Sequence, residues 1–197
     1  MELLALNVIL KFISMEKYLR IGNRTAIISF LCGTIIFALY FITSWAELLF
    51  VGYVFIVIAG LVNMVILIDL IIKSKNNKAN KFKLYKTCGL ILLNIPMMLI
   101  YCWIVSILMG TMRITLNNKT QTKLTNLKIM GCEDKLVEKI MPGQSKTVWV
   151  NITGDCSIKM TYSANGQQKD EVIAGYLTGG MGQKMNYNIG DKKQKQF

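Results

Sequence analysis

Three stretches of the chain are continuously apolar and free of charged residues. They cover residues 26–45, 48–68 and 87–110. About 20 helical residues are needed to cross the roughly 30 Å hydrocarbon core of a bilayer. Buried helices of a soluble protein could have the same composition, but the chain has no other elements to cover three of them. The pattern therefore predicts a domain of three transmembrane helices within residues 25–110.

From residue 111 onward, apolar and polar residues alternate, which is typical of half-buried β-strands. Such runs are centred near residues 114, 127, 137, 149, 159, 173 and 187. Turn sequences separate them, and Asn165-Gly166 is the strongest hairpin signal among these. We expect residues 111–190 to form an all-β domain, either an antiparallel immunoglobulin-like sandwich or a small barrel of about seven strands.

The two ends of the chain differ from these domains. In residues 1–24, polar residues recur at helical spacing among leucines and isoleucines, which predicts an amphipathic helix on the cytoplasmic membrane surface. A frayed apolar tail, or an upstream extension with Met15 as an alternative start, would also fit this segment. Residues 191–197 are polar and basic, and we expect a disordered tail.

The basic residues near the ends of the spans predict their orientation. The segment before the first span and the loop over residues 73–86 are rich in basic residues, whereas the turn Ala46-Glu47 has none. These basic residues are Lys11, Lys17, Arg20, Arg24, Lys73, Lys75, Lys78, Lys81, Lys83 and Lys86. Short cytoplasmic segments carry the excess of Lys and Arg. We therefore expect a cytoplasmic N-terminus and, after three spans, an external β-domain.

Four polar side chains fall within or beside the spans. Thr34, Asn63 and Asn94 lie at similar depths when counted from the cytoplasmic ends. The simpler hypothesis is that they form hydrogen bonds between helices, with Asn63 and Asn94 in contact, and the alternative is a polar path or ligand site. Asp69 lies one turn inside the boundary with Lys73 at i+4, so an interfacial ion pair explains it without a transport role.

The cysteines divide between the two predicted compartments. Cys32, Cys88 and Cys102 lie in or beside spans, whereas Cys132 and Cys156 are alone in the external domain. A cysteine pair in an oxidising compartment is typical of a disulfide, and two buried free thiols are the alternative. We therefore expect Cys132 and Cys156 to be bonded.

The amino-acid composition limits the catalytic and metal-binding chemistry that we expect of this protein. Hydrophobic residues make up 53% and charged residues 17% of the 197 residues, the net charge is +12, and histidine is absent. The commonest general base and metal ligand is thus missing. We interpret Glu133, Asp134 and Glu138 as solvated residues of a loop and a strand edge. The alternative is a cation site. We expect no enzyme, no cofactor, no metal site and no nucleic-acid partner.

Two functional hypotheses follow. The first is a non-enzymatic membrane protein whose external β-domain binds another membrane or periplasmic protein, in an envelope complex or as an immunity protein against a membrane-targeted toxin. The second is a membrane effector or pore former that oligomerises while its β-domain senses a ligand. The preference for lysine over arginine suggests an AT-rich bacterial source, hence a bacterial inner (cytoplasmic) membrane. In that setting the glycosylation sequence Asn118-Lys119-Thr120 carries no meaning.

Overall fold

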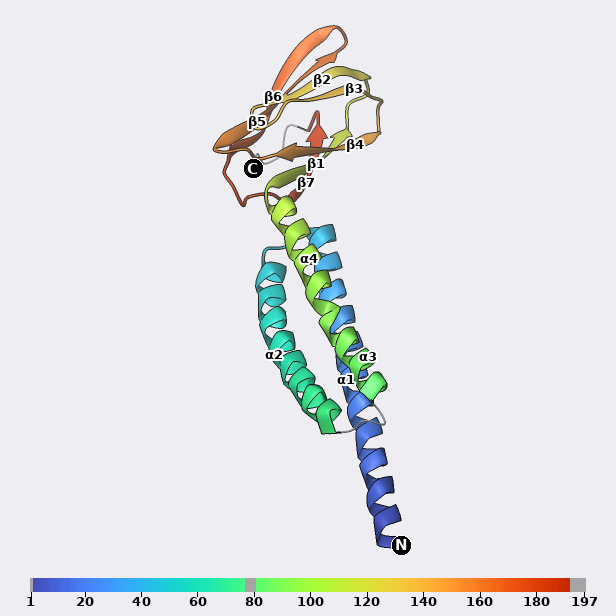
Figure 1. Cartoon of the computed structure of the whole chain (residues 1–197). Helices are drawn as coiled ribbons and strands as arrows, with labels where there is room; N and C mark the ends of the chain where they lie inside the picture. The colour runs from blue at the N-terminus through green and yellow to red at the C-terminus, as the bar shows by residue number, and fades with distance from the viewer. Residues whose placement is uncertain (1, 77–80, 192–197) are drawn as a thin grey trace. The chain divides into compact units, whose positions relative to one another are not determined.

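The computed structural model describes residues 2–76 and 81–191, and describes side chains over 16–73 and 81–191. The chain divides into two compact units, one ending at Trp103 and the other beginning at Ile104. Figure 1 shows the helical elements in the first part of the chain and the strands in the second. The expected tail over 191–197 lies outside the described residues except for Asp191.

The first part of the chain is helical. Its helices are α1 (Glu2–Thr43), α2 (Glu47–Asn76), α3 (Lys81–Leu92) and α4 (Asn94–Met109). Three segments are long and apolar enough to cross a membrane, namely Glu16–Thr43, Glu47–Lys73 and Lys81–Met109. The number and order of the predicted apolar segments are therefore confirmed. Each begins before its predicted start, and the second also ends beyond its predicted end.

Helix α1 runs without a break from the expected N-terminal helix over 1–24 into the first span. Most side chains of that N-terminal segment lie outside the described residues. The link to α2 is tight, and Ser44 adopts a left-handed conformation with φ 57°. Part of the Lys-rich loop expected over 73–86 is helical, because α2 continues past Lys73 and α3 begins at Lys81.

The third span is interrupted at Leu93, between α3 and α4. Pro96 lies three residues later, has no N–H to donate, and its ring would clash with the preceding turn of a continuous helix. The missing N–H and the ring of Pro96 account for the break between the two helices. Close packing among α1, α2 and α3 occurs mainly at the end near Lys81, where the buried side chains are Ala26, Leu70, Leu84, Cys88 and Ile91.

The second part of the chain contains strands at all seven predicted positions. They are β1 (Thr111–Asn118), β2 (Leu124–Met130), β3 (Lys135–Ile140), β4 (Ser145–Asn151), β5 (Cys156–Ala164), β6 (Gln167–Leu177) and β7 (Lys184–Ile189). They form two sheets with the orders β4-β1-β7 and β3-β2-β5-β6. Apolar side chains from both sheets share one core, which includes Met112, Ile114, Leu116, Leu127, Ile129, Val150, Ile158, Met160, Ile173 and Ile189.

One pairing differs from the expected antiparallel arrangement, because β1 and β7 run parallel. Successive strands alternate in direction, so all odd-numbered strands run the same way. Two odd-numbered strands placed side by side can pair only in parallel, and the five strands between them supply the long crossover that such pairing needs. The hairpin at Asn165-Gly166 agrees with its prediction, with φ values of 53° and 76° that fit a type I′ turn.

The strand directions give the β-domain two ends. The end at Thr111 follows α4 directly, and loops 131–134, 152–155 and 178–183 also lie there. We call it the helix-proximal end. The opposite end carries turns 119–123, 141–144 and 165–166, and we call it the distal end.

Candidate functional site

Asn63 and Asn94 each form a hydrogen bond with α1. Asn63 Nδ2 donates to Ser29 Oγ at 2.9 Å, and Asn94 Nδ2 donates to the Ala26 carbonyl at 3.1 Å. Among the described residues no hydrogen bond joins Asn63 to Asn94, which differs from the expected contact. An amide in hydrocarbon needs a hydrogen-bond partner. Here the Ser29 hydroxyl and the Ala26 carbonyl, both on α1, accept the bonds from the two amides.

Thr34 lies further along α1, and its side chain bonds to Tyr101 of α4. Its Oγ1 is 2.8 Å from the hydroxyl of Tyr101, which also stacks on Phe37 with ring centroids 4.6 Å apart. Thr34 is five residues beyond Ser29, about 7.5 Å along the helix axis. The intramembrane polar groups are therefore distributed along α1 rather than gathered in one layer.

Asp69 forms the expected ion pair with Lys73 at 2.5 Å. The Lys73 ammonium also lies 2.9 Å from the centroid of the Tyr18 ring, so the pair connects α2 with α1. Asp69 retains 45% side-chain exposure. This arrangement is a cation–π and ion-pair contact at the end of two helices.

At the helix-proximal end, the β-domain binds the last carbonyl groups of α4. The Gly182 N–H donates to the Met109 carbonyl and the Ile152 N–H donates to the Gly110 carbonyl, both at 2.8 Å. The Thr111 hydroxyl donates to the Ile107 carbonyl at 2.8 Å. The last carbonyls of a helix have no partners within the helix. Two loops of the β-domain and β1 itself therefore cap α4.

Gly182 is needed for this close approach. A Cβ atom at residue 182 would lie 2.4 Å from the Leu108 carbonyl oxygen and 2.5 Å from the Thr111 nitrogen. These neighbours are backbone atoms, so they cannot move aside as a flexible side chain would. The absence of a side chain at Gly182 thus lets the loop over residues 178–183 pack directly on the backbone at the end of α4.

The predicted disulfide is present at the helix-proximal end. Cys132 and Cys156 are bonded, with a Cα–Cα distance of 5.2 Å. Gly131 precedes the first cysteine with φ 117°, and a Cβ there would lie 1.8 Å from the Ser157 carbonyl oxygen. The sequence predicted the bond from cysteine count, but the requirement for glycine beside it appears only in the fold.

The adjacent acids do not converge on a cation site. Glu133 accepts hydrogen bonds from the Asn151 N–H at 2.8 Å and from Lys135 at 2.7 Å, which lower the pKa of its carboxyl. Asp134 pairs with Lys128 at 3.2 Å. Over the described residues, no group of three or more acidic or cysteine side chains could hold a metal ion.

A carboxylate links the two sheets. Glu171 on β6 accepts hydrogen bonds from the hydroxyls of Tyr162 at 2.5 Å and of Tyr187, on the other sheet, at 2.8 Å. The pKa of each tyrosine is raised well above its ordinary value. Burial is the larger cause, and the hydrogen bond to the carboxylate is the second. The arrangement fixes β7 against the four-stranded sheet.

Asn118 organises the distal end. Its side chain is 1% exposed, and Nδ2 donates to the carbonyls of Thr122 at 2.9 Å and Ile140 at 3.0 Å. Its Oδ1 accepts from both the N–H and the hydroxyl of Thr120. The sequence Asn118-Lys119-Thr120 is therefore a buried turn motif. Sequence reasoning noticed these residues as a glycosylation match and missed this role.

Exposed charge is concentrated at the distal end. The exposed lysines on or beside its turns are Lys119, Lys123, Lys139, Lys146 and Lys169. Glu138 and Asp170 are exposed acids in the same region. We call these five lysines the distal basic surface. At the helix-proximal end, Lys128 and Lys135 are paired with acids, and Lys159 and Lys184 are also exposed.

The exposed apolar side chains have a different distribution. Leu136, Trp149 and Tyr176 are 73%, 44% and 58% exposed. The register places all three within two residues of the helix-proximal end of their strands. Trp149 also lies beside Arg113, whose guanidinium carbon is 5.7 Å from the ring centroid. Met141, which is 41% exposed, lies in the distal turn 141–144, so three of the four exposed large apolar side chains described for this domain lie at the helix-proximal end.

No family model matches the chain, and comparisons with curated proteins and with solved structures also find no match.

Proposed function

We propose that this is a non-enzymatic integral membrane protein that presents its β-domain outside the cytoplasm for binding another protein. The distal basic surface is the proposed binding face. The observation that carries the proposal is the set of five exposed lysines on or beside the distal turns, where the exposed acids include Glu138 and Asp170.

The helix-proximal end suits a position at the membrane surface. Tryptophan and tyrosine favour the membrane–water interface, and Trp149 and Tyr176 lie at this end. The proposal places the distal end away from the bilayer, where it is open to a partner.

Charge indicates the chemistry of that partner. Lysines on a rigid surface increase the association rate with an acidic protein and favour it over a basic one. The proposed partner is therefore the acidic surface of a membrane or periplasmic protein, as in an envelope complex or a toxin–immunity pair. The proposed location is a bacterial inner membrane with a cytoplasmic N-terminus.

For the β-domain itself, we favour a sandwich over a small barrel. The two sheets have separate strand orders and share one core. The three-stranded sheet of this domain places β1 between β4 and β7. This strand order differs from that of the ABED and CFG sheets of immunoglobulin domains. The term immunoglobulin-like therefore refers to the architecture and not to the strand order.

Site-specific photo-cross-linking in the native membrane tests the binding face. A photoreactive residue at Lys119 or Lys146 should yield a discrete adduct with one acidic protein, and the same residue at Lys128 should not. Charge reversal of Lys119, Lys123 and Lys146 to Glu should abolish the adduct formed from a probe at Lys169. Equal adducts from both ends of the domain would contradict the proposal.

A second measurement separates the alternative, an oligomerising pore former. The alternative predicts a homo-oligomer that releases dye from liposomes, whereas the binding proposal predicts one copy with a foreign partner. Thr34, Asn94 and the Nδ2 of Asn63 have hydrogen-bond partners within the same chain, which supports the binding proposal over a polar path. Among the described residues, the buried Oδ1 of Asn63 has no partner. An alkaline phosphatase fusion at the C-terminus should be active if the orientation is as proposed.

A further inference from the structure

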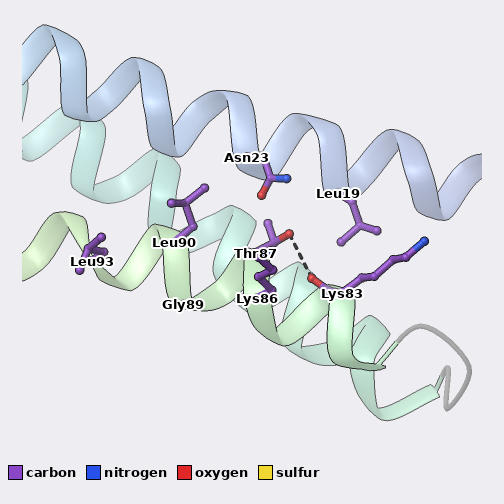
Figure 2. A pocket seen from close by; sticks show the side chains of 8 residues that line it. All are labelled: Leu19, Asn23, Lys83, Lys86, Thr87, Gly89, Leu90 and Leu93. Atoms are coloured by element: carbon purple, nitrogen blue, oxygen red, sulfur yellow. Dashed lines mark hydrogen bonds between the residues drawn. The ribbon is translucent and has the colours of Figure 1, made fainter.

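A groove of about 450 Å³ lies between α1 and α3 (Figure 2). It is lined by Leu19, Asn23, Lys83, Lys86, Thr87, Gly89, Leu90 and Leu93. Two helices of one compact unit form it, so its walls are fixed relative to one another. None of the polar contacts described above involves this groove.

The groove is polar at one end and apolar at the other. Along α3, the exposed Lys83 and Lys86 come first and Leu90 and Leu93 follow. Figure 2 shows Leu19 of α1 opposite Lys83, and the exposed Asn23 further along α1, opposite Thr87. From Lys86 to Leu93 the helix rises about 10 Å. This distance corresponds to the passage from the headgroup layer into the hydrocarbon of one leaflet.

The floor of the groove is a close contact between the two helices. A Cβ at Gly22 on α1 would lie 2.7 Å from Thr87 Cγ2, and Thr87 is 3% exposed. The Thr87 hydroxyl donates to the Lys83 carbonyl at 3.2 Å, the bond drawn in Figure 2. The contact at Gly22 therefore sets the separation of the walls, and the lysine side chains above it are left at the surface.

The charge around the groove is strongly basic. Lys17, Arg20 and Arg24 lie on the same stretch of α1 as Leu19 and Asn23, and Lys81 begins α3. Of the two nearby acids, Asp69 is paired with Lys73, and Glu16 is exposed three residues before Leu19. An anion with an apolar chain is the ligand that complements both ends of the groove.

We propose that this groove is a binding site for one acidic phospholipid of the leaflet that faces the start of α3. Lys83 and Lys86 bind its phosphate, Asn23 donates a hydrogen bond to the headgroup, and Leu90 and Leu93 contact an acyl chain. Basic pockets between helices on the cytoplasmic side bind acidic headgroups in this manner. The site is independent of the function proposed for the β-domain.

Native mass spectrometry of the full chain from vesicles of phosphatidylcholine and phosphatidylglycerol tests the site. The wild type should retain one phosphatidylglycerol per chain in preference to phosphatidylcholine. The double variant K83Q/K86Q should bind it about 30-fold more weakly, because each basic residue near the surface contributes about a factor of five. The control K17Q/K81Q removes the same charge from outside the groove and should retain the lipid.

A second pair of variants tests the acyl subsite. A Cβ at Gly89 meets nothing within 4 Å, so Gly89→Leu should fold and fill the groove. It should reduce lipid retention at least several-fold while all charges remain. Gly60 on α2 is equally open, and Gly60→Leu is its matched control.

Each of three results would overturn the proposal. Equal losses in K83Q/K86Q and K17Q/K81Q would mean that the lipid responds only to general surface charge. Full retention in G89L would remove the acyl chain from the groove. Displacement of the lipid by inorganic phosphate would show a site for the free anion. Monodisperse elution and unchanged helical circular dichroism confirm that each variant is folded.

Discussion

Large apolar side chains of the helical unit mostly point outward, whereas those of the β-domain mostly point inward. On α2, for example, Phe50, Val65 and Ile72 are more than half exposed, while Ile114, Leu127 and Ile158 of the β-domain are fully buried. The helical unit has a small buried cluster and relies on single hydrogen bonds between helices. The β-domain has a shared core, a disulfide and a cross-sheet carboxylate.

The difference follows from the solvent that each region is built for. Between helices in lipid there is little hydrophobic driving force, so close packing and a few polar contacts hold them together. In water, burial of apolar area is the main favourable contribution to folding. Substitutions in the β-domain should therefore have larger effects than substitutions in the helical unit.

The largest effect is expected at Gly131. Gly131→Ala places a Cβ on the Ser157 carbonyl in a backbone conformation that disfavours it. We expect a loss of more than about 4 kcal/mol in the free energy of unfolding of the β-domain, and poor formation of the disulfide. Thermal near-UV circular dichroism and non-reducing electrophoresis measure both. Gly179→Ala, where a Cβ meets nothing within 4 Å, should be within about 0.5 kcal/mol of the wild type.

Removal of the disulfide should have the next largest effect. The bond closes a loop between residues separated by 24 positions. Replacing Cys132 and Cys156 by Ser should lower the free energy of unfolding of the β-domain by about 3 kcal/mol. Cys102→Ala, at an exposed helical position, should leave it unchanged. Equal unfolding midpoints with and without reductant would contradict the contribution assigned to the bond.

A smaller effect is expected from the tyrosines that bind Glu171. Their pKa is raised in the folded state, so the folded protein holds these protons more tightly than the unfolded chain. The resulting stability is complete below about pH 10, the ordinary tyrosine pKa, and is lost as the pH rises further. Tyr162→Phe with Tyr187→Phe should weaken this alkaline dependence and cost about 2 kcal/mol at neutral pH. Tyr176→Phe, at an exposed position, is the control.

The smallest effects should come from the intramembrane amides. Asn94→Leu and Asn63→Leu should each weaken helix association by about 0.6 kcal/mol, and by no more than roughly 1.7 kcal/mol. Because the two side chains bond to different groups of α1, the double variant should be additive within about 0.5 kcal/mol. A larger coupling, measured by reversible unfolding in bicelles, would show that the two amides interact directly.

Local pattern was sufficient for much of this protein. The three spans, the seven strand positions, the break at Pro96 and the turn at Asn165-Gly166 all follow from periodicity and backbone chemistry within short windows. The cysteine pair was predictable because only two cysteines lie in the β-domain. The ion pair of Asp69 with Lys73 was predictable because both lie on one helix face at i+4.

Other features depend on which elements become neighbours. The parallel pairing of β1 with β7, the partners of Asn63 and Asn94, and the position of the groove each join residues far apart in the chain. The same holds for Glu171, which looks like an ordinary strand carboxylate until β7 packs beside it. No periodicity within a single segment encodes such partners.

Hydrophobic periodicity and span length are local properties of a sequence. They were therefore enough to predict the elements, their order, and whether each part faces lipid or water. Tertiary packing set where the exposed lysines of the β-domain gather, which carbonyls of α4 are capped, and which residues of α1 and α3 line the groove. These depend on strand direction and helix packing, where residues distant in sequence compete for the same space.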